Sequence, residues 1–194
     1  MFPQLAPTLH PMLEGIFHVI VAWALLLLGF VSEDNPPRKS SLPAQPFLIA
    51  TAFLTNIFYL PYLILRAKPT DNLLPPSTAL QELGESIYLP IFSLSVLGAS
   101  AVWAVFARPE FGDLMTRFSS FKHIFSSNIL AYSFGVDVLT FSLFQSWLVR
   151  DDANRRTWRS ESMKRTAIQS TLVPFLGLAF YLIQRARHAT LAES

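Results

Sequence analysis

A single acid inside a long apolar stretch is the residue in this sequence best placed to do chemistry. Residues 127–149 read SNILAYSFGVDVLTFSLFQSWLV and carry one ionisable group, Asp137. An ionisable side chain at membrane depth is costly, so it is by default a candidate functional residue. Asp137 can act as a general acid or base in a pocket that excludes water. It can also be structural, as a carboxylate hydrogen-bonded between helices, and the sequence leaves both interpretations open.

Helical spacing places further polar residues beside this acid. Ser133, Asp137 and Thr140 fall along one stripe of the helix that residues 127–149 are expected to form. Asn56 and Tyr59, in another apolar stretch, are candidate hydrogen-bond partners for the carboxylate. We therefore expect a polar pocket lined by Asn56, Tyr59, Ser133 and Thr140, facing the interior of a helical bundle.

Two glutamates are candidate counterparts of Asp137. Glu14 and Glu85 lie at the expected ends of two other apolar stretches. Two carboxylates in different environments can divide the acid and base roles of a reaction, which gives Asp137 with Glu14 or Glu85 as the candidate catalytic set. The structural alternative is that acids at a helix start favour the positive end of the helix dipole.

A run of charged residues follows the acid-bearing stretch. Asp151-Asp152-Ala153-Asn154-Arg155 partly matches the aspartate-rich motif with which prenyl-transferring enzymes hold magnesium diphosphate. Arg155 stands in the place of the last acid and would repel a metal ion. The spacing favours an exposed ion pair between Asp152 and Arg155 or Arg156, three and four residues later.

The sequence excludes several other chemistries. It has no cysteine, which removes disulfides, zinc–thiolate sites, iron–sulfur clusters and cysteine nucleophiles. His18 is a candidate ligand for a haem or a chlorin magnesium, but no second histidine shares its stretch, and a structural histidine is favoured. No Glu-x-x-His pair and no motif of soluble enzymes occurs. We expect no metal site and assign no cofactor.

Uncharged runs define the elements that would position these residues. Charged residues make up 14% of the 194 residues and hydrophobic residues 52%, whereas a soluble domain carries about 25% charged residues. A helix needs about 20 residues to cross a bilayer. We expect a single domain, an all-α polytopic integral membrane bundle of about five spans, at 12–31, 45–65, 85–107, 127–149 and 166–184. One or two interfacial helices should accompany them, the clearest at 108–123, where apolar and charged residues alternate.

The charge distribution bears on partners and orientation. A net charge of +2 without a basic face argues against nucleic acid. The expected partners are membrane lipids, with other membrane subunits or an apolar small molecule left open. Five spans divide the Lys and Arg residues 8 to 7 between the two sides, which is a tie. Only the dense segment 150–165 favours a cytoplasmic-side location, and weakly.

The last third of the chain carries a recognisable pattern. The acid-bearing helix leads into Asp-Asp-x-x-Arg-Arg and then into Pro174-x-x-Gly177-x-x-x-Tyr181-Leu182-x-x-Arg185. Together with Asn56-x-x-Tyr59-Leu60-Pro61-Tyr62, this resembles short uncharacterised multi-pass membrane proteins of plastids and cyanobacteria. The resemblance implies a membrane fold and a photosynthetic lineage, and it implies no catalytic residue.

Two functions from different classes follow. The first is a non-catalytic subunit or an assembly or scaffold factor of a membrane complex. The alternative is a small intramembrane enzyme of the isomerase or cyclase type, acting on a lipid or isoprenoid through Asp137 with Glu14 or Glu85. Proton-coupled transport is a weaker third, since few paired charges line the stretches. Plastid thylakoid and endoplasmic reticulum are both open as the membrane.

Overall fold

The computed structural model describes residues 8–32, 46–47, 50–51, 56–65, 79–156 and 161–193, and every regular element in these ranges is helical. Three of these helices are long and apolar enough to cross a membrane. The elements, in chain order, are α1 (Pro11–Val31), α3 (Asn56–Leu65), α4 (Ala79–Glu85), α5 (Tyr88–Phe106), the 3-10 turn η2 (Pro109–Phe111), α6 (Leu114–Ser127), α7 (Ile129–Arg155), α8 (Glu161–Leu172) and α9 (Leu176–Glu193).

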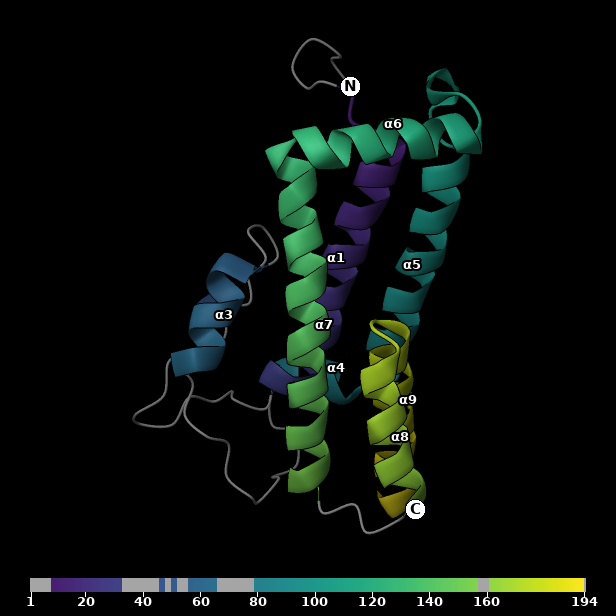
Figure 1. Cartoon of the computed structure of the whole chain (residues 1–194). Coiled ribbons are helices and arrows are strands. Elements are labelled where there is room, and N and C mark those ends of the chain that lie inside the picture. Colours follow the sequence, from purple (N-terminus) through teal and green to yellow (C-terminus); the bar gives the residue numbers. More distant parts are fainter. Residues whose placement is uncertain are drawn as a thin grey trace.

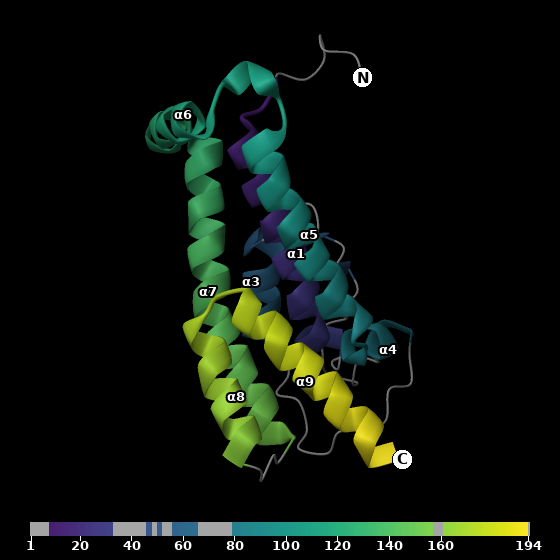
Figure 2. The same cartoon turned by 90° about the vertical axis from the view of Figure 1, so that its right-hand side faces the viewer.

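The three long helices α1, α5 and α7 run along the molecule, with α3 beside the middle of α7 and with α8 and α9 along one half of the bundle (Figure 1). Helix α6 lies across one end, which we call the α6 end. Helix α4, the last turns of α1 and α7 and the polar ends of α8 and α9 lie at the other end, which we call the charged end. Figure 2 shows the same separation from the side.

Helix α1 is the centre of the bundle. It begins at Pro11, whose missing N–H costs nothing in the first turn. It packs against α5 on one side and α7 on another. Its buried residues include Trp23 and Phe30, and both meet aromatic rings of neighbouring helices. Helix α3 contacts α7 through the rings of Tyr59 and Phe141, whose centroids lie 6.1 Å apart.

Helices α5, α6 and α7 are joined by tight turns with clear local causes. Arg108 has φ 56° and Gly112 has φ 77°, and these left-handed residues bracket η2. The Asp113 side chain accepts from the Thr116 N–H and begins α6. The Asn128 side chain accepts from the Leu130 N–H and begins α7. These caps turn the chain through the α6 end and back into the bundle.

The predicted interfacial helix at 108–123 corresponds to η2 and α6, at 109–111 and 114–127. Three expected spans, at 12–31, 85–107 and 127–149, correspond to α1, α5 and α7. The span expected at 45–65 is described only in part, with α3 covering its last ten residues.

The prediction of one membrane-spanning helix at 166–184 is wrong. The chain turns back on itself between α8 and α9, where Phe175 has φ 61° and the Gly177 N–H bonds the Val173 carbonyl. Pro174 has no N–H to continue α8. A Cβ at Gly177 would collide with Ser170, so the two helices approach as closely as only glycine allows. The apolar run is therefore a helical hairpin.

Two glycines provide a matched test of the α1–α5 contact. A Cβ at Gly15 would lie 3.0 Å from the Ser100 carbonyl oxygen and 3.3 Å from the Ala104 Cβ, whereas a Cβ at Gly98 meets nothing within 4 Å. We predict that Gly15→Leu lowers the free energy of unfolding in detergent by about 1–3 kcal/mol, through overpacking. Gly98→Leu should not lower it, and the better helix propensity of leucine should raise it by up to about 1 kcal/mol. Equal effects of the two substitutions would contradict the packing described.

Candidate functional site

A buried carboxylate at the charged end, Asp152, is the centre of the largest polar cluster in the described residues. It is fully buried in the last turn of α7. Arg156 Nε donates to its Oδ1 at 2.9 Å, and the Tyr181 hydroxyl donates to its Oδ2 at 2.6 Å. Arg155 Nη2 lies 3.7 Å from Oδ1 and Arg185 Nη1 lies 3.5 Å from Oδ2. Asp152 thus joins α7 to α9.

Arg185 extends this cluster to α1 and α4. Its Nη2 donates to the Gly29 carbonyl at 3.0 Å and to the Gly84 carbonyl at 2.7 Å. The guanidinium carbon lies 5.6 Å from the ring centroid of Phe30. The side chain is 1% exposed. One buried cation of α9 therefore holds the ends of three other helices, α1, α4 and α7.

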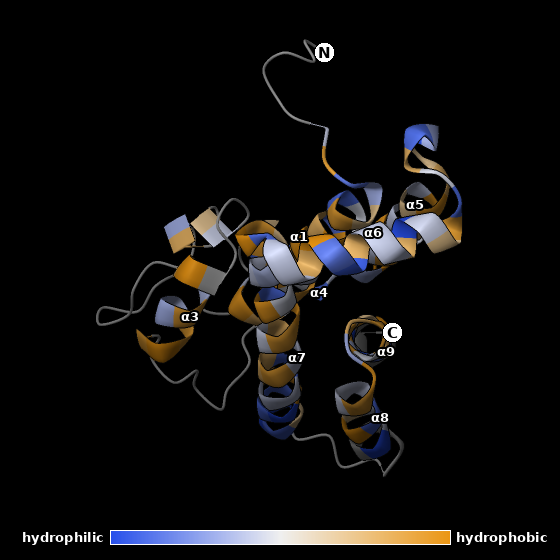
Figure 3. Ribbon diagram, turned by 45° about the horizontal axis from the view of Figure 1, so that its top comes forward, coloured by the Kyte–Doolittle hydropathy of each residue, from blue (hydrophilic) through white to orange (hydrophobic). Residues whose placement is uncertain are grey.

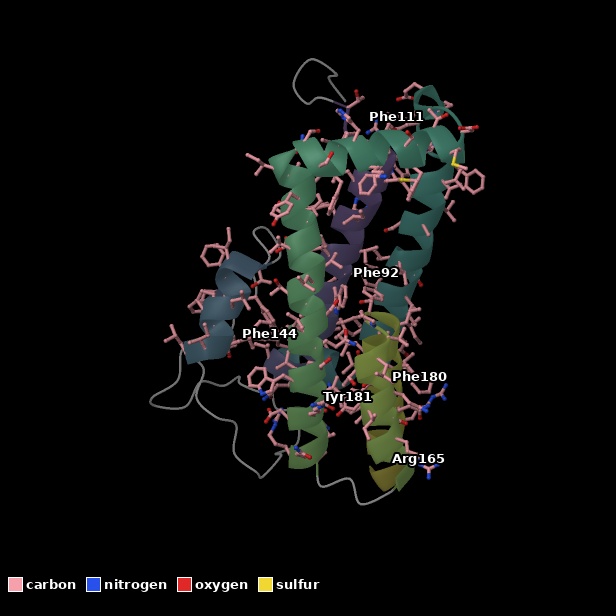
Figure 4. All side chains as sticks on the ribbon, in the orientation of Figure 1. Phe92, Phe111, Phe144, Arg165, Phe180 and Tyr181 are labelled. Atoms are coloured by element: carbon pink, nitrogen blue, oxygen red, sulfur yellow. The ribbon has the colours of Figure 1, made fainter. Side chains whose placement is uncertain are left out.

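Glu85 closes the cluster from α4. Its Oε1 accepts from Arg156 Nη2 at 2.6 Å and lies 3.4 Å from Arg185 Nη2. Buried charges are tolerated when they are paired and hydrogen-bonded. Asp152, Glu85, Arg156 and Arg185 meet this condition among themselves, with Tyr181 and two backbone carbonyls as further partners. We call the side chains of Glu85, Asp152, Arg156, Tyr181 and Arg185 the ion-pair cluster. Figure 4 shows Tyr181 in the space between α7 and α9.

A second ion pair lies at the α6 end. Glu14 accepts from Arg108 at 2.6 Å and 3.0 Å through its two carboxylate oxygens, and from the indole N–H of Trp103 at 2.8 Å. Such a bidentate pair is among the stronger hydrogen-bonded contacts. The Glu14 carboxylate therefore faces the end of α5 and fixes the start of α1 against it.

Arg117 organises the same end of the molecule. It is 2% exposed and donates to four backbone carbonyls, those of Ala104, Ala107, Arg108 and Gly112, at 3.3, 2.5, 3.0 and 2.9 Å. These carbonyls belong to the end of α5 and the turn after it, where helix geometry leaves carbonyls short of backbone partners; the Arg108 carbonyl also accepts from the Phe111 N–H at 3.1 Å. Arg117 thus secures the bend from α5 into α6.

His10 connects α6 to the start of α1. Its Nδ1 accepts from the Met12 N–H at 3.2 Å, which makes the ring the cap of α1, and its Nε2 lies 3.0 Å from the Ser120 hydroxyl. Only an unprotonated Nδ1 can accept this bond. Burial, and then the charge of Arg117, lower the pKa of His10 below its ordinary 6.5. The neutral imidazole is the form that the fold selects.

The predicted polar pocket around Asp137 has a different bonding pattern. Asp137 is half-buried on α7. The hydroxyls of Ser133 and Thr140 donate to carbonyls of their own helix, at Leu130 and Val136. Tyr59 is buried and packs on α7 at Phe141, whereas the Asn56 side chain lies outside the described part of the chain. The stripe is present, but two of its members are satisfied within α7.

The three acids of the candidate catalytic set are distributed along the bundle. Glu85 belongs to the ion-pair cluster at the charged end, and Glu14 is paired with Arg108 at the α6 end. Asp137 precedes Asp152 by 15 residues, which is about 22 Å of helix. Asp137 and Glu85 are therefore far apart along the bundle axis. Glu14 is nearer to the level of Asp137, but its carboxylate is directed to α5.

Gln145 is the polar residue that links the hairpin to the long helices. Its Oε1 accepts from the Trp23 indole at 3.1 Å and from the Phe175 backbone N–H at 3.1 Å. Its Nε2 donates to the Ser170 carbonyl at 2.8 Å. A single buried amide thus satisfies backbone groups on both sides of the hairpin turn.

Comparison of the chain with known protein families, with curated proteins and with solved structures found no match. Within the described ranges, no three His, Asp or Glu side chains come together as metal ligands.

The sequence pattern indicated part of the ion-pair cluster. The pairing of Asp152 with Arg155 and Arg156 follows the predicted spacing, but the pair is buried rather than exposed. Tyr181 and Arg185, which the sequence presents only as members of the Pro174–Arg185 pattern, are its partners from α9. The sequence places Gln145 near the end of the stripe that carries Asp137, and Arg117 among the charged residues of the interfacial segment, but it does not indicate that either side chain bonds backbone groups of other elements.

Adjacent aspartates test the cluster. We predict that Asp152→Asn destabilises the folded protein by about 3–5 kcal/mol, because it removes the fully buried carboxylate that Arg156 and Arg185 share and leaves Glu85 as their one remaining counter-charge within the ion-pair cluster. Asp151→Asn is the control, since Asp151 is one-third exposed and pairs with Arg155 at 3.3 Å. It should lower stability by less than about 1 kcal/mol. The measurement is chemical unfolding in mixed micelles. Similar losses from both variants would mean that Asp152 is not the centre of the cluster.

The His10 cap predicts a pH dependence of stability. Because the folded state lowers the pKa of His10, stability is greatest above 6.5 and falls as the pH drops below 6.5, where the unfolded chain takes up the proton first. His10→Asn keeps a capping side chain but does not titrate. We expect the melting temperature of this variant to change less between pH 7.5 and pH 5.5 than that of the wild type. His123→Asn, at an exposed site on α6, should behave as wild type. An unchanged pH slope in His10→Asn would refute the assignment.

Proposed function

We propose that this chain is an integral membrane protein that crosses the bilayer with α1, α5 and α7, and that it is a non-catalytic subunit or assembly factor of a membrane complex. The observation that carries the proposal is the use of its acids. Glu14, Glu85 and Asp152 are each bound by arginines of the same chain. Their charges hold helices together.

The apolar surface supports a membrane location. Within an apolar segment of 18 residues in each helix, only 22% of the segment in α5 and 17% of the segment in α7 are buried against the rest of the chain. The side chains left exposed include Phe106, Leu139 and Leu143, at 75%, 61% and 65%. Apolar faces of this size mark contact with lipid or with another protein. Figure 3 shows hydrophobic colouring along α7, which turns hydrophilic at the charged end.

The same faces support a role as a subunit. Exposed small residues on α5, Gly98 among them, allow close helix contact in lipid. The related pair Ser100 and Ala104 already contacts Gly15 of α1 in this way. The described residues thus leave α5 with one small-residue face used inside the chain and another facing outwards.

The experiment is purification of the tagged full-length chain from its native membrane in mild detergent, after crosslinking within the membrane. We expect partner proteins in fixed stoichiometry by mass spectrometry. We also expect Asp137→Asn to accumulate normally, to keep these partners and to leave the lipid composition of the membrane unchanged. Ser133→Ala, on the same stripe, is the matched control.

Two results would contradict the proposal. A monomer without partners would remove the subunit role. A change in membrane lipids or isoprenoids with Asp137→Asn, at normal accumulation, would favour the alternative of an intramembrane enzyme with Asp137 as its acid or base.

A further inference from the structure

We propose that the α8–α9 hairpin is a re-entrant element: it enters the membrane from the charged end, turns inside the apolar layer and leaves on the same side, which is the cytosolic side. This inference rests on the membrane location proposed above. It concerns which surface of the protein meets which leaflet.

Helix α8 is too short to cross the bilayer. Helix α8 has 12 residues, about 18 Å at 1.5 Å per residue, against a hydrocarbon core of about 30 Å. Helix α9 then runs back towards the charged end. Its Tyr181 meets Asp152, and four residues later its Arg185 meets the Gly29 carbonyl near the end of α1. Both legs therefore have their polar ends at the same end of the bundle.

The depth of the turn follows from its contacts with α7 and α1. Gln145, which bonds Phe175 and Ser170 at the turn, precedes Arg150 by five residues, or about 8 Å of helix. Trp23, which bonds the same amide, precedes Val31, the last residue of α1, by eight residues, or about 12 Å. The turn thus lies within the apolar part of both helices, roughly 10 Å from the charged end.

The surface of the hairpin is consistent with this depth. Its exposed side chains near the turn are large and apolar: Ile168, Leu172, Val173, Leu176 and Phe180. Its charged residues lie away from the turn, with Arg165 on the first half of α8 (Figure 4) and Arg187 on the second half of α9. Backbone in an apolar layer must be satisfied by the protein, and Gln145 does this for the Ser170 carbonyl and the Phe175 N–H.

The charges of the described residues then fix the side. With the hairpin re-entrant, the charged end carries seven Lys and Arg residues and the α6 end carries three. The seven are Arg150, Arg155, Arg156, Lys164, Arg165, Arg185 and Arg187; the three are Arg108, Arg117 and Lys122. Five spans left the two sides tied. The excess of Lys and Arg marks the cytosolic side, where the anionic leaflet also attracts them.

The absence of cysteine from the sequence makes the test direct. Single-cysteine variants of the full chain are expressed in a bacterial inner membrane and treated with a membrane-impermeant maleimide, before and after lysis. Glu110→Cys reports on the α6 end, Asn154→Cys on the end of α7, and Glu193→Cys on the end of α9. Val173→Cys reports on the hairpin turn, and Leu139→Cys is the control inside the bilayer.

We expect Glu110→Cys to react in intact cells. Asn154→Cys and Glu193→Cys should react only after lysis, and Val173→Cys and Leu139→Cys only in detergent. Reaction of Asn154→Cys and Glu193→Cys from opposite sides would overturn the re-entrant hairpin, and so would free reaction at Val173→Cys. Reaction of both from outside, with Glu110→Cys protected, would overturn the orientation. Reaction of Leu139→Cys without detergent would instead refute the membrane location itself, which separates the two proposals.

Discussion

The buried ion pair between Asp152 and Arg185 is the interaction on which the charged end of this protein depends. It connects residues 33 positions apart and draws in Arg156, Tyr181 and Glu85. Arg185 also binds the carbonyls of Gly29 and Gly84. If either charge were removed, the other would lose a buried counter-charge inside a protein interior that stabilises charge poorly. The helices α1, α4, α7 and α9 therefore meet at this end in one arrangement.

At the α6 end, different side chains satisfy the polar groups of the helix ends. Arg117 satisfies the carbonyls at the end of α5, and His10 satisfies the start of α1. Between these two polar ends lies a largely apolar core, and within it the amide of Gln145 bonds Trp23 and the hairpin turn. A short bundle with large apolar faces thus gains its specificity from three polar clusters, at the two ends and at the turn. This arrangement suits a protein that must keep one shape while its long sides contact lipid or partners.

The sequence predicted the helices whose signal is local. Runs of uncharged residues identified α1, α5 and α7, and alternating character identified α6. The hairpin was missed because hydropathy reports how apolar a segment is and not whether the chain turns within it. The run at 166–184 is continuously apolar, although the chain reverses at Pro174 and Phe175. The site was predicted in part for a related reason. The spacing of Asp152 and Arg156 is local, whereas the burial of that pair depends on Arg185 and Glu85, which tertiary packing brings from α9 and α4.

The most direct test of this account is a double-mutant cycle on Asp152 and Arg185. Unfolding free energies would be measured in mixed micelles for the wild type, Asp152→Asn, Arg185→Gln and the double variant. We expect the double variant to be less destabilised than the sum of the two single variants, by at least about 1.5 kcal/mol, which is within the range for residues in one network. Additive losses would show that the two charges act independently, and would contradict a cluster held together by their interaction.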